Sequence, residues 1–175
     1  RIRHADLQAL GLVETICSGN GDIYIKGSAS PGRWLYDVDL QAENVDWNMP
    51  DGYIHLPQGL TANILSTPTS VNASVDCAST SLEFSSASGL KNVVDCFTAT
   101  MPLVSKQIEA KRLEVEQLQA SLPPFRFDLN ASGRGLVRQL LTATGMQLDT
   151  LSATVSNDSL LRLNASMLGL NTGSL

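Results

Sequence analysis

Few residues in this chain are suited to acid–base, nucleophilic or metal chemistry, because its 175 residues include only two histidines and three cysteines. His4 lies near the first residue, and His55 lies in the stretch YIHLP. Strand alternation places His55 opposite Ile54 and Leu56 and predicts that it points to solvent. A solitary histidine of this kind is more often a surface residue than a ligand or a base.

The three cysteines, Cys17, Cys77 and Cys96, do not have the spacing of a zinc site. Cys77 continues the apolar side of SVNASVDC, and Cys96 precedes Phe97 in a helical pattern, so both are expected to be small core residues. Two states remain open for them. We favour free buried thiols over a Cys77–Cys96 disulfide formed in an oxidising compartment.

Two further patterns suggest chemistry only weakly. The stretch GNGD at 19–22 lacks the later glycine and the Lys-Ser/Thr of a phosphate loop, and it precedes a strand, so a tight turn is the better interpretation. Glu114 and Glu116 are two residues apart on an expected helix and do not face each other. We therefore predict no catalytic residue, no metal ligand and no cofactor, and hence a protein that is not an enzyme.

Four N-x-S/T sequons occur, at Asn72, Asn130, Asn157 and Asn164. They would be glycan acceptors in a secreted eukaryotic protein. Three of them read NAS inside alternating stretches, where alanine continues an apolar face and asparagine and serine a polar one. We favour this strand interpretation over the glycan interpretation.

Composition indicates a folded chain that does not bind nucleic acid. Hydrophobic residues make up 43% and charged residues 17%, which argues against disorder, and the net charge of −5 argues against a phosphate-backbone binder. No apolar run approaches the roughly 20 residues of a membrane-spanning helix. We expect 1–175 to be a single segment excised from a larger protein.

Hydrophobic periodicity divides the chain into three parts. Residues 1–86 alternate with a period of two and predict a β meander, with a hairpin corner at Pro31–Gly32. Residues 87–122 change to helical spacing and predict a helical hairpin or a helix kinked near Pro102. Its apolar stripe is expected to pack on the sheet and consists of Leu90, Val93, Phe97, Ile108, Val115 and Leu118.

Residues 123–175 return to alternation. They predict a strand from Phe125, a short helix at 136–145 and a hairpin that turns at Asn157–Asp158. The order of elements is that of an α+β fold dominated by β structure, with an antiparallel sheet, one long kinked helix and one short helix.

Three stretches together resemble the AsmA/TamB-like proteins of Gram-negative cell envelopes, in particular the Bacteroidetes-type translocation and assembly modules. They are GDIYIKGSASPGRWLYDVDLQAENVDWNMPDGYIHLP, LEVEQLQASLPPFRFDLNASG and MQLDTLSATVSNDSLLRLNASMLGLNTGSL. The resemblance implies a periplasmic protein anchored in the inner membrane and built as a curved, taco-like open sheet with an apolar groove. It also implies phospholipid transport between the inner and outer membranes, or outer-membrane assembly with a barrel protein as partner.

The expected ligands of such a groove are phospholipid acyl chains, held on the concave side by apolar residues that share one strand phase. The candidates are Ile23, Ile25, Val38, Leu40, Ile54, Leu56, Phe125, Phe127, Leu129, Leu161 and Leu163. Two alternatives are open: a closed α+β core in which the long helix covers the sheet, and a structural or protein-interaction module of the cell envelope.

Overall fold

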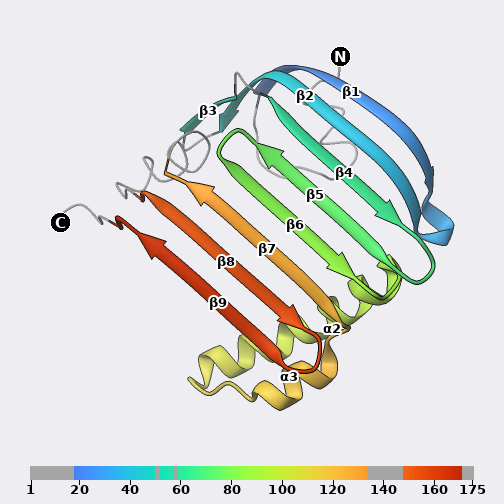
Figure 1. Cartoon of the computed structure of the whole chain (residues 1–175), viewed down its shortest axis with the longest axis vertical. Coiled ribbons are helices and arrows are strands. Elements are labelled where there is room, and N and C mark those ends of the chain that lie inside the picture. The colour runs from blue at the N-terminus through green and yellow to red at the C-terminus, as the bar shows by residue number, and fades with distance from the viewer. Residues whose placement is uncertain (1–17, 50–51, 57–58, 134–147, 171–175) are drawn as a thin grey trace.

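The computed structural model describes residues 18–49, 52–56, 59–133 and 148–170, and its dominant element is one antiparallel sheet of nine strands (Figure 1). The strands are ordered β1-β2-β4-β5-β6-β7-β8-β9, and β3 pairs with the C-terminal part of β2. Their bounds are β1 Ser18–Ser30, β2 Leu35–Met49, β3 Gly52–Leu56, β4 Leu60–Ser66, β5 Val71–Cys77, β6 Thr80–Ser86, β7 Phe125–Ser132, β8 Thr150–Asn157 and β9 Leu161–Leu168. The sheet is not closed, and the α+β, β-dominant class is confirmed.

The register of the sheet separates apolar from polar side chains. Directly opposed residues of antiparallel strands share a face. One row runs through Ile25, Leu40, Ala62, Val75, Leu82, Leu129, Ala153 and Ala165, and the next through Gly27, Val38, Ile64, Ala73, Phe84, Phe127, Val155 and Leu163. We call the face that these two rows form the apolar face, and its reverse the polar face. A single polar-face row illustrates the contrast: Lys26, Asp39, Asn63, Ser74, Glu83, Asp128, Thr154 and Asn164.

A β-bulge in β2 keeps the apolar side chains of the first hairpin on the apolar face. The register with β1 shifts between Asp22, which opposes Glu43, and Asn20, which opposes Asp46. Two residues of β2 therefore lie opposite one residue of β1, and Asn44 takes a left-handed φ of 50°. The extra residue brings Val45 onto the same face as Ala42, in agreement with the apolar positions in the sequence.

The best-buried residues lie in rows at the two ends of the strands. One row crosses five strands through Ser66, Val71, Ser86, Phe125 and Asn157, all of them buried. At the opposite end, Cys77 and Ala131 are buried on the same face. The two rows between these ends are mostly half-buried, so the middle of the apolar face is less covered than its ends.

The helices lie beside one end of the strands (Figure 1). Helix α2 spans Leu90–Glu109 and α3 spans Val115–Ser121. The ring of Phe97 in α2 lies 6.4 Å from that of Phe84 and 5.1 Å from that of Phe125, measured between ring centroids. Phe97 therefore packs on the apolar face, as its place in the expected stripe predicts.

The predicted kink near Pro102 is not confirmed, whereas the alternative prediction for 87–122, a helical hairpin, agrees with the structure. Helix α2 continues through Pro102 to Glu109, since proline removes a single backbone donor from the helix. The chain breaks instead at 110–114, where Lys111 takes a left-handed φ of 53°. There the Gln107 side chain accepts a hydrogen bond from the Glu114 backbone N–H at 2.8 Å, which closes a helical hairpin.

Helix α2 buries polar side chains against α3 and exposes apolar ones. The Thr100 hydroxyl lies 3.2 Å from that of Ser121, and Gln107 donates to Gln117 at 3.0 Å. The adjacent stripe of α2 is exposed and consists of Val94, Met101 and Ile108. Ile108 and Val115 were expected in the buried stripe, and both are instead at least half exposed, at 62% and 50%.

Both predicted turns are confirmed. Pro31–Arg33 form a 3-10 turn between β1 and β2, and the chain reverses between Asn157 and Leu161. The expected short helix at 136–145 lies outside the described residues, as do the first seventeen residues.

One buried asparagine ties the end of the helical hairpin to the sheet. The side-chain amide of Asn157, only 4% exposed, donates to the backbone carbonyls of Gln119, Leu122 and Pro123 at 3.2, 2.9 and 3.1 Å. The Ser86 hydroxyl donates to the next carbonyl, that of Pro124, at 2.5 Å. The link from α3 to β7 is therefore held by hydrogen bonds from β6 and β8.

We expect Asn157→Asp to destabilise the fold by at least about 2 kcal/mol, because a carboxylate facing three carbonyl oxygens can donate no hydrogen bond. The free energy of unfolding is measured by urea titration. The decrease in the free energy of unfolding should be smaller at low pH. Burial raises the pKa of the introduced carboxyl, and the protonated carboxyl can donate one hydrogen bond. Asn130→Asp, at an exposed position of β7, is the control and should stay within about 0.5 kcal/mol of wild type. Equal effects of the two substitutions would contradict this role of Asn157.

Candidate functional site

The apolar face is the candidate site, and the described lipid-groove candidates all lie on it. Ile23 and Ile25 come from β1, Val38 and Leu40 from β2, and Leu56 from β3. Phe125, Phe127 and Leu129 come from β7, and Leu161 and Leu163 from β9. Ile54 opposes Trp47 in the register, but its side chain lies outside the described ones. The strand phase predicted from the sequence therefore brings these residues to one surface.

These candidates differ in how far they are covered. Leu56 and Phe125 are buried, whereas Val38, Leu40, Phe127, Leu129 and Leu161 are half-buried. Ile23, Ile25 and Leu163 are 43%, 61% and 70% exposed because they belong to the edge strands β1 and β9. Tyr24, on the other face of β1, is also exposed, at 59%, so the edge strand is open on both faces. A groove on the apolar face remains a prediction.

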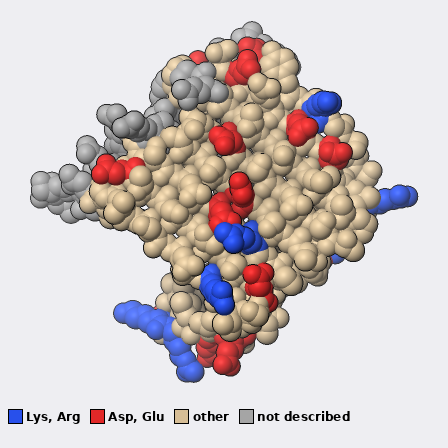
Figure 2. All heavy atoms as spheres, viewed as in Figure 1, with Lys and Arg blue, Asp and Glu red and all other residues tan. Residues whose placement is uncertain are grey.

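The rows of the apolar face carry no charge. Charged strand residues such as Lys26, Asp39, Glu83 and Arg126 lie in register on the polar face. Figure 2 shows that the face turned to the viewer has scattered acidic side chains and that acidic and basic atoms meet near its middle. The two faces therefore differ in chemistry: the middle rows of one are uncharged and mostly apolar, and the other presents charged and hydrogen-bonding groups.

An ion pair that sequence analysis missed lies in the polar face. The Arg126 guanidinium donates to both carboxylate oxygens of Asp128, at 2.6 and 3.0 Å, and the Thr154 hydroxyl donates to the same carboxylate at 2.7 Å. The hydrogen bonds from Arg126, and then that from Thr154, lower the pKa of Asp128. The Arg-x-Asp spacing on one strand phase was the available signal.

Glu83 lies directly opposite Asp128 in the register, so two carboxylates stand side by side on β6 and β7. Acid catalysis by such a pair needs one carboxyl with a raised pKa. Asp128 shows the reverse direction, because it is fixed as a carboxylate by Arg126 and Thr154. We interpret Arg126 and Asp128 as a structural ion pair that fixes side chains across β7 and β8.

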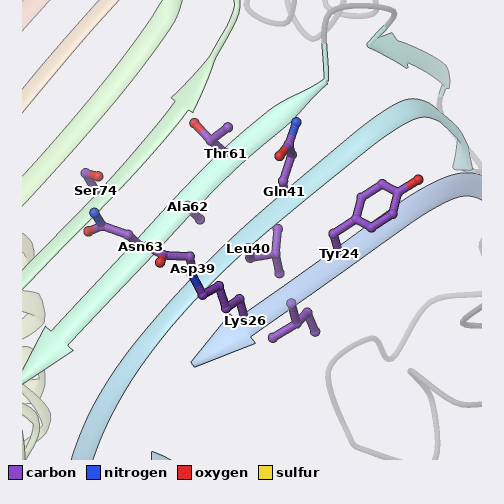
Figure 3. Close-up of a pocket in the computed structure, with 10 residues that line it drawn as sticks. Tyr24, Lys26, Asp39, Leu40, Gln41, Thr61, Ala62, Asn63 and Ser74 are labelled. Atoms are coloured by element: carbon purple, nitrogen blue, oxygen red, sulfur yellow. The ribbon is translucent and has the colours of Figure 1, made fainter. Parts of the chain in front are cut away.

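Shallow hollows on the polar face are lined mainly by side-chain amides, hydroxyls and charged groups. One of about 550 Å³ lies over β1, β2, β4 and β5 and includes Tyr24, Lys26, Asp39, Gln41 and Asn63 (Figure 3). A second of about 240 Å³ lies beside Glu83, Arg126 and Asp128. Both could hydrogen-bond a polar solute through these groups, although residues of the apolar-face rows also contribute to their lining: Ile25, Leu40 and Ala62 in the first, and Ala73 and Phe84 in the second.

The structure agrees with the prediction that Cys77 and Cys96 are free thiols, but only Cys77 is buried. Cys77 is buried and Cys96 is partly exposed, with its thiol 3.7 Å from the Asn92 side-chain oxygen, so Cys96 is not the core residue expected. Both thiols are free, in agreement with the favoured state. Burial, and then the nearby Asp76 carboxylate, raise the pKa of the Cys77 thiol. Cys17 lies outside the described residues.

The remaining motifs take surface or structural positions. His55 is exposed, as predicted, and its Nδ1 lies 2.5 Å from the Asp46 carboxylate. The sequon residues Asn72, Asn130 and Asn164 are exposed on the polar face, whereas Asn157 is buried. The strand interpretation of the NAS sequons therefore agrees with the structure. Within the described residues, no group of three or more His, Cys, Asp or Glu side chains could hold a metal ion.

Comparison of the chain with protein-family models, with curated proteins and with solved structures finds no match in any of the three. Among the described helices, neither α2 nor α3 is long and apolar enough to cross a bilayer.

We expect Cys96 to react with iodoacetamide much faster than Cys77 in the folded Cys17→Ser variant. The thiolate is the reactive form, and both burial and the raised pKa of Cys77 disfavour it at neutral pH. Mass spectrometry of timed samples should show one modification well before the second, and unfolding in urea should make the two rates similar. Equal rates in the folded protein would contradict the burial of Cys77.

Proposed function

We propose that this chain is a non-enzymatic, lipid-handling segment of an AsmA/TamB-like periplasmic protein, whose apolar face receives the acyl chains of phospholipids. The observation that carries the proposal is the continuity of that face. Two adjacent rows of apolar and small residues run without a charge through eight strands, from β1 to β9. Transport between the inner and outer membranes, or outer-membrane assembly with a barrel partner, is the role that the sequence resemblance adds.

A sheet face of this kind is chemically suited to acyl chains. Each methylene transferred from water to an apolar surface contributes about 0.8 kcal/mol. The backbone N–H and C=O groups of the inner strands are used in strand pairing, so a bound chain meets no unpaired polar group beneath it. The binding energy therefore grows with the number of strands that an acyl chain crosses and needs no reactive residue.

The position of the helical hairpin favours an accessible face over a closed core. Phe97 of α2 contacts Phe84 and Phe125, near the strand end that also holds Ser86 and Asn157. Leu40, Leu82 and Leu129, in one of the two rows between the buried ends, are only half-buried. A contiguous, partly exposed apolar surface in a folded protein is typical of a site that binds an apolar ligand or partner.

A protein-interaction module of the envelope is the second candidate. The exposed stripe of Val94, Met101 and Ile108 on α2 favours it, because an apolar stripe at seven-residue spacing can pack against another helix. Lipid binding separates the two candidates, since the stripe lies on the helix and the proposed lipid surface on the sheet.

We expect Phe127→Asp to leave the protein folded but to weaken binding of phosphatidylethanolamine that carries a fluorescent acyl chain by about tenfold or more. Phe127 lies in the middle of β7 and is half-buried, so a carboxylate there can stay hydrated while the face is empty. It must be desolvated when an acyl chain covers it. Binding is followed by fluorescence, and folding by circular dichroism.

The matched control is Asn130→Asp, which adds the same carboxylate to the polar face of β7 and should leave lipid binding unchanged. Leu163→Asp, at the 70% exposed position of β9, repeats the test at a site where unfolding is not expected. Wild-type protein that binds no lipid would contradict the proposed function. Cooperative unfolding of Phe127→Asp, with normal lipid binding by Leu163→Asp, would favour a closed core.

A further inference from the structure

The hollow of about 550 Å³ on the polar face, which we call the tyrosine hollow, combines one aromatic ring with hydrogen-bonding side chains (Figure 3). Its polar lining comes from two neighbouring rows of the register: Tyr24, Gln41 and Thr61 in one, and Lys26, Asp39, Asn63 and Ser74 in the other. The rows are two residues apart along each strand, and hence about 7 Å apart. Strands β2, β4 and β5 lie inside the sheet, so the floor of the hollow does not depend on where the sheet ends.

Several side chains of the tyrosine hollow have hydrogen-bonding groups that the folded chain does not use. Within the residues that the structure describes, the side chains of Tyr24, Thr61 and Asn63 make no hydrogen bond. Further along the polar face, by contrast, the Ser152 hydroxyl donates to the Asn130 side chain at 3.0 Å, so that pair is already satisfied. A hydroxyl or amide without a protein partner hydrogen-bonds water or a ligand. The tyrosine hollow can therefore hydrogen-bond a ligand without first breaking contacts of these three side chains.

The charges and the aromatic ring of this hollow suit a neutral ligand. Lys26 and Asp39 lie directly opposite each other in the register, so the charged groups of the lining cancel. Tyr24 is 59% exposed, and its ring offers an apolar face and a hydroxyl. Asn63, between Asp39 and Ser74 in the register, offers both a donor and an acceptor. A saccharide matches this combination, because a sugar ring has a C–H face and a rim of hydroxyls that both donate and accept.

We propose that the tyrosine hollow binds a neutral oligosaccharide. The Tyr24 ring packs against the C–H face of one sugar ring, the Asp39 carboxylate accepts hydrogen bonds from its hydroxyls, and the Asn63 amide both donates and accepts. The saccharide lies on the polar face, whereas the acyl chains of the proposed function lie on the apolar face. The two proposals are therefore independent, and either can fail without the other.

Titration of the ¹⁵N-labelled chain, followed by two-dimensional ¹H–¹⁵N NMR, tests the site with maltotriose, cellotriose and triacetylchitotriose as probes. We expect at least one probe to bind with a dissociation constant of about 10 mM or lower. It should shift the backbone amide signals of 24–26, 39–41 and 61–63 and leave those of 128–130 and 152–154, on β7 and β8, in place. No saturable shift with any of the three probes, or shifts on β7 and β8 alone, would overturn the proposal.

Matched variants test the roles of the side chains. Tyr24→Ala and Asn63→Ala should each raise the dissociation constant about fivefold or more, because one removes the ring and the other the amide. Asn164→Ala removes the same amide at the other end of the same row, on β9, and should leave binding unchanged. All three positions are exposed, so the variants should fold, which circular dichroism checks. Equal effects of Asn63→Ala and Asn164→Ala, or tighter binding of inorganic phosphate than of the sugars, would overturn the proposal.

Discussion

Antiparallel register is the constraint on which the rest of this structure depends. Every strand alternates with period two, and the pairing from β2 through β9 holds the alternation in phase across the sheet. A slip of one residue at any ladder would turn a whole strand's apolar residues to the polar face. Where the phase would be lost, between Ala42 and Val45, Asn44 provides the extra residue that restores it. The separation of the two faces follows from this pairing.

Burial is therefore concentrated where other elements meet the ends of the strands. Val71 and Phe125 provide apolar packing in one end row, while Ser86 and Asn157 bind the carbonyls of the link between α3 and β7. Hydrogen bonds of the Thr100 and Gln107 side chains join α2 to α3. The contact between the two helices therefore includes polar side chains of α2. The middle of the apolar face is left half-buried, and this property leads to the functional proposal.

Local patterns predicted most of the sheet, and contacts between distant residues explain what they missed. Alternation placed Val38, Phe127 and Leu163 on one face, because side-chain direction in a strand depends only on phase. The hairpin break at 110–114 was missed because it depends on the Gln107 side chain reaching Glu114, with no glycine or proline to mark it. Thr154 binds Asp128 from 26 residues away, a contact that pairing of β7 and β8 creates. The exposure of Ile108 likewise depends on how α3 docks, which periodicity does not encode.

Paramagnetic broadening by a phospholipid with a nitroxide on its acyl chain tests the central claim, which is that acyl chains meet the apolar face, most directly. Methyl signals of Leu40, Leu82 and Leu129 report on one of the two rows between the buried ends of that face, and those of Thr61 and Thr154 on the polar face. Our account predicts that the leucine signals broaden on addition of the lipid while the threonine signals persist. Equal broadening on both faces, or none on the leucines, would contradict it.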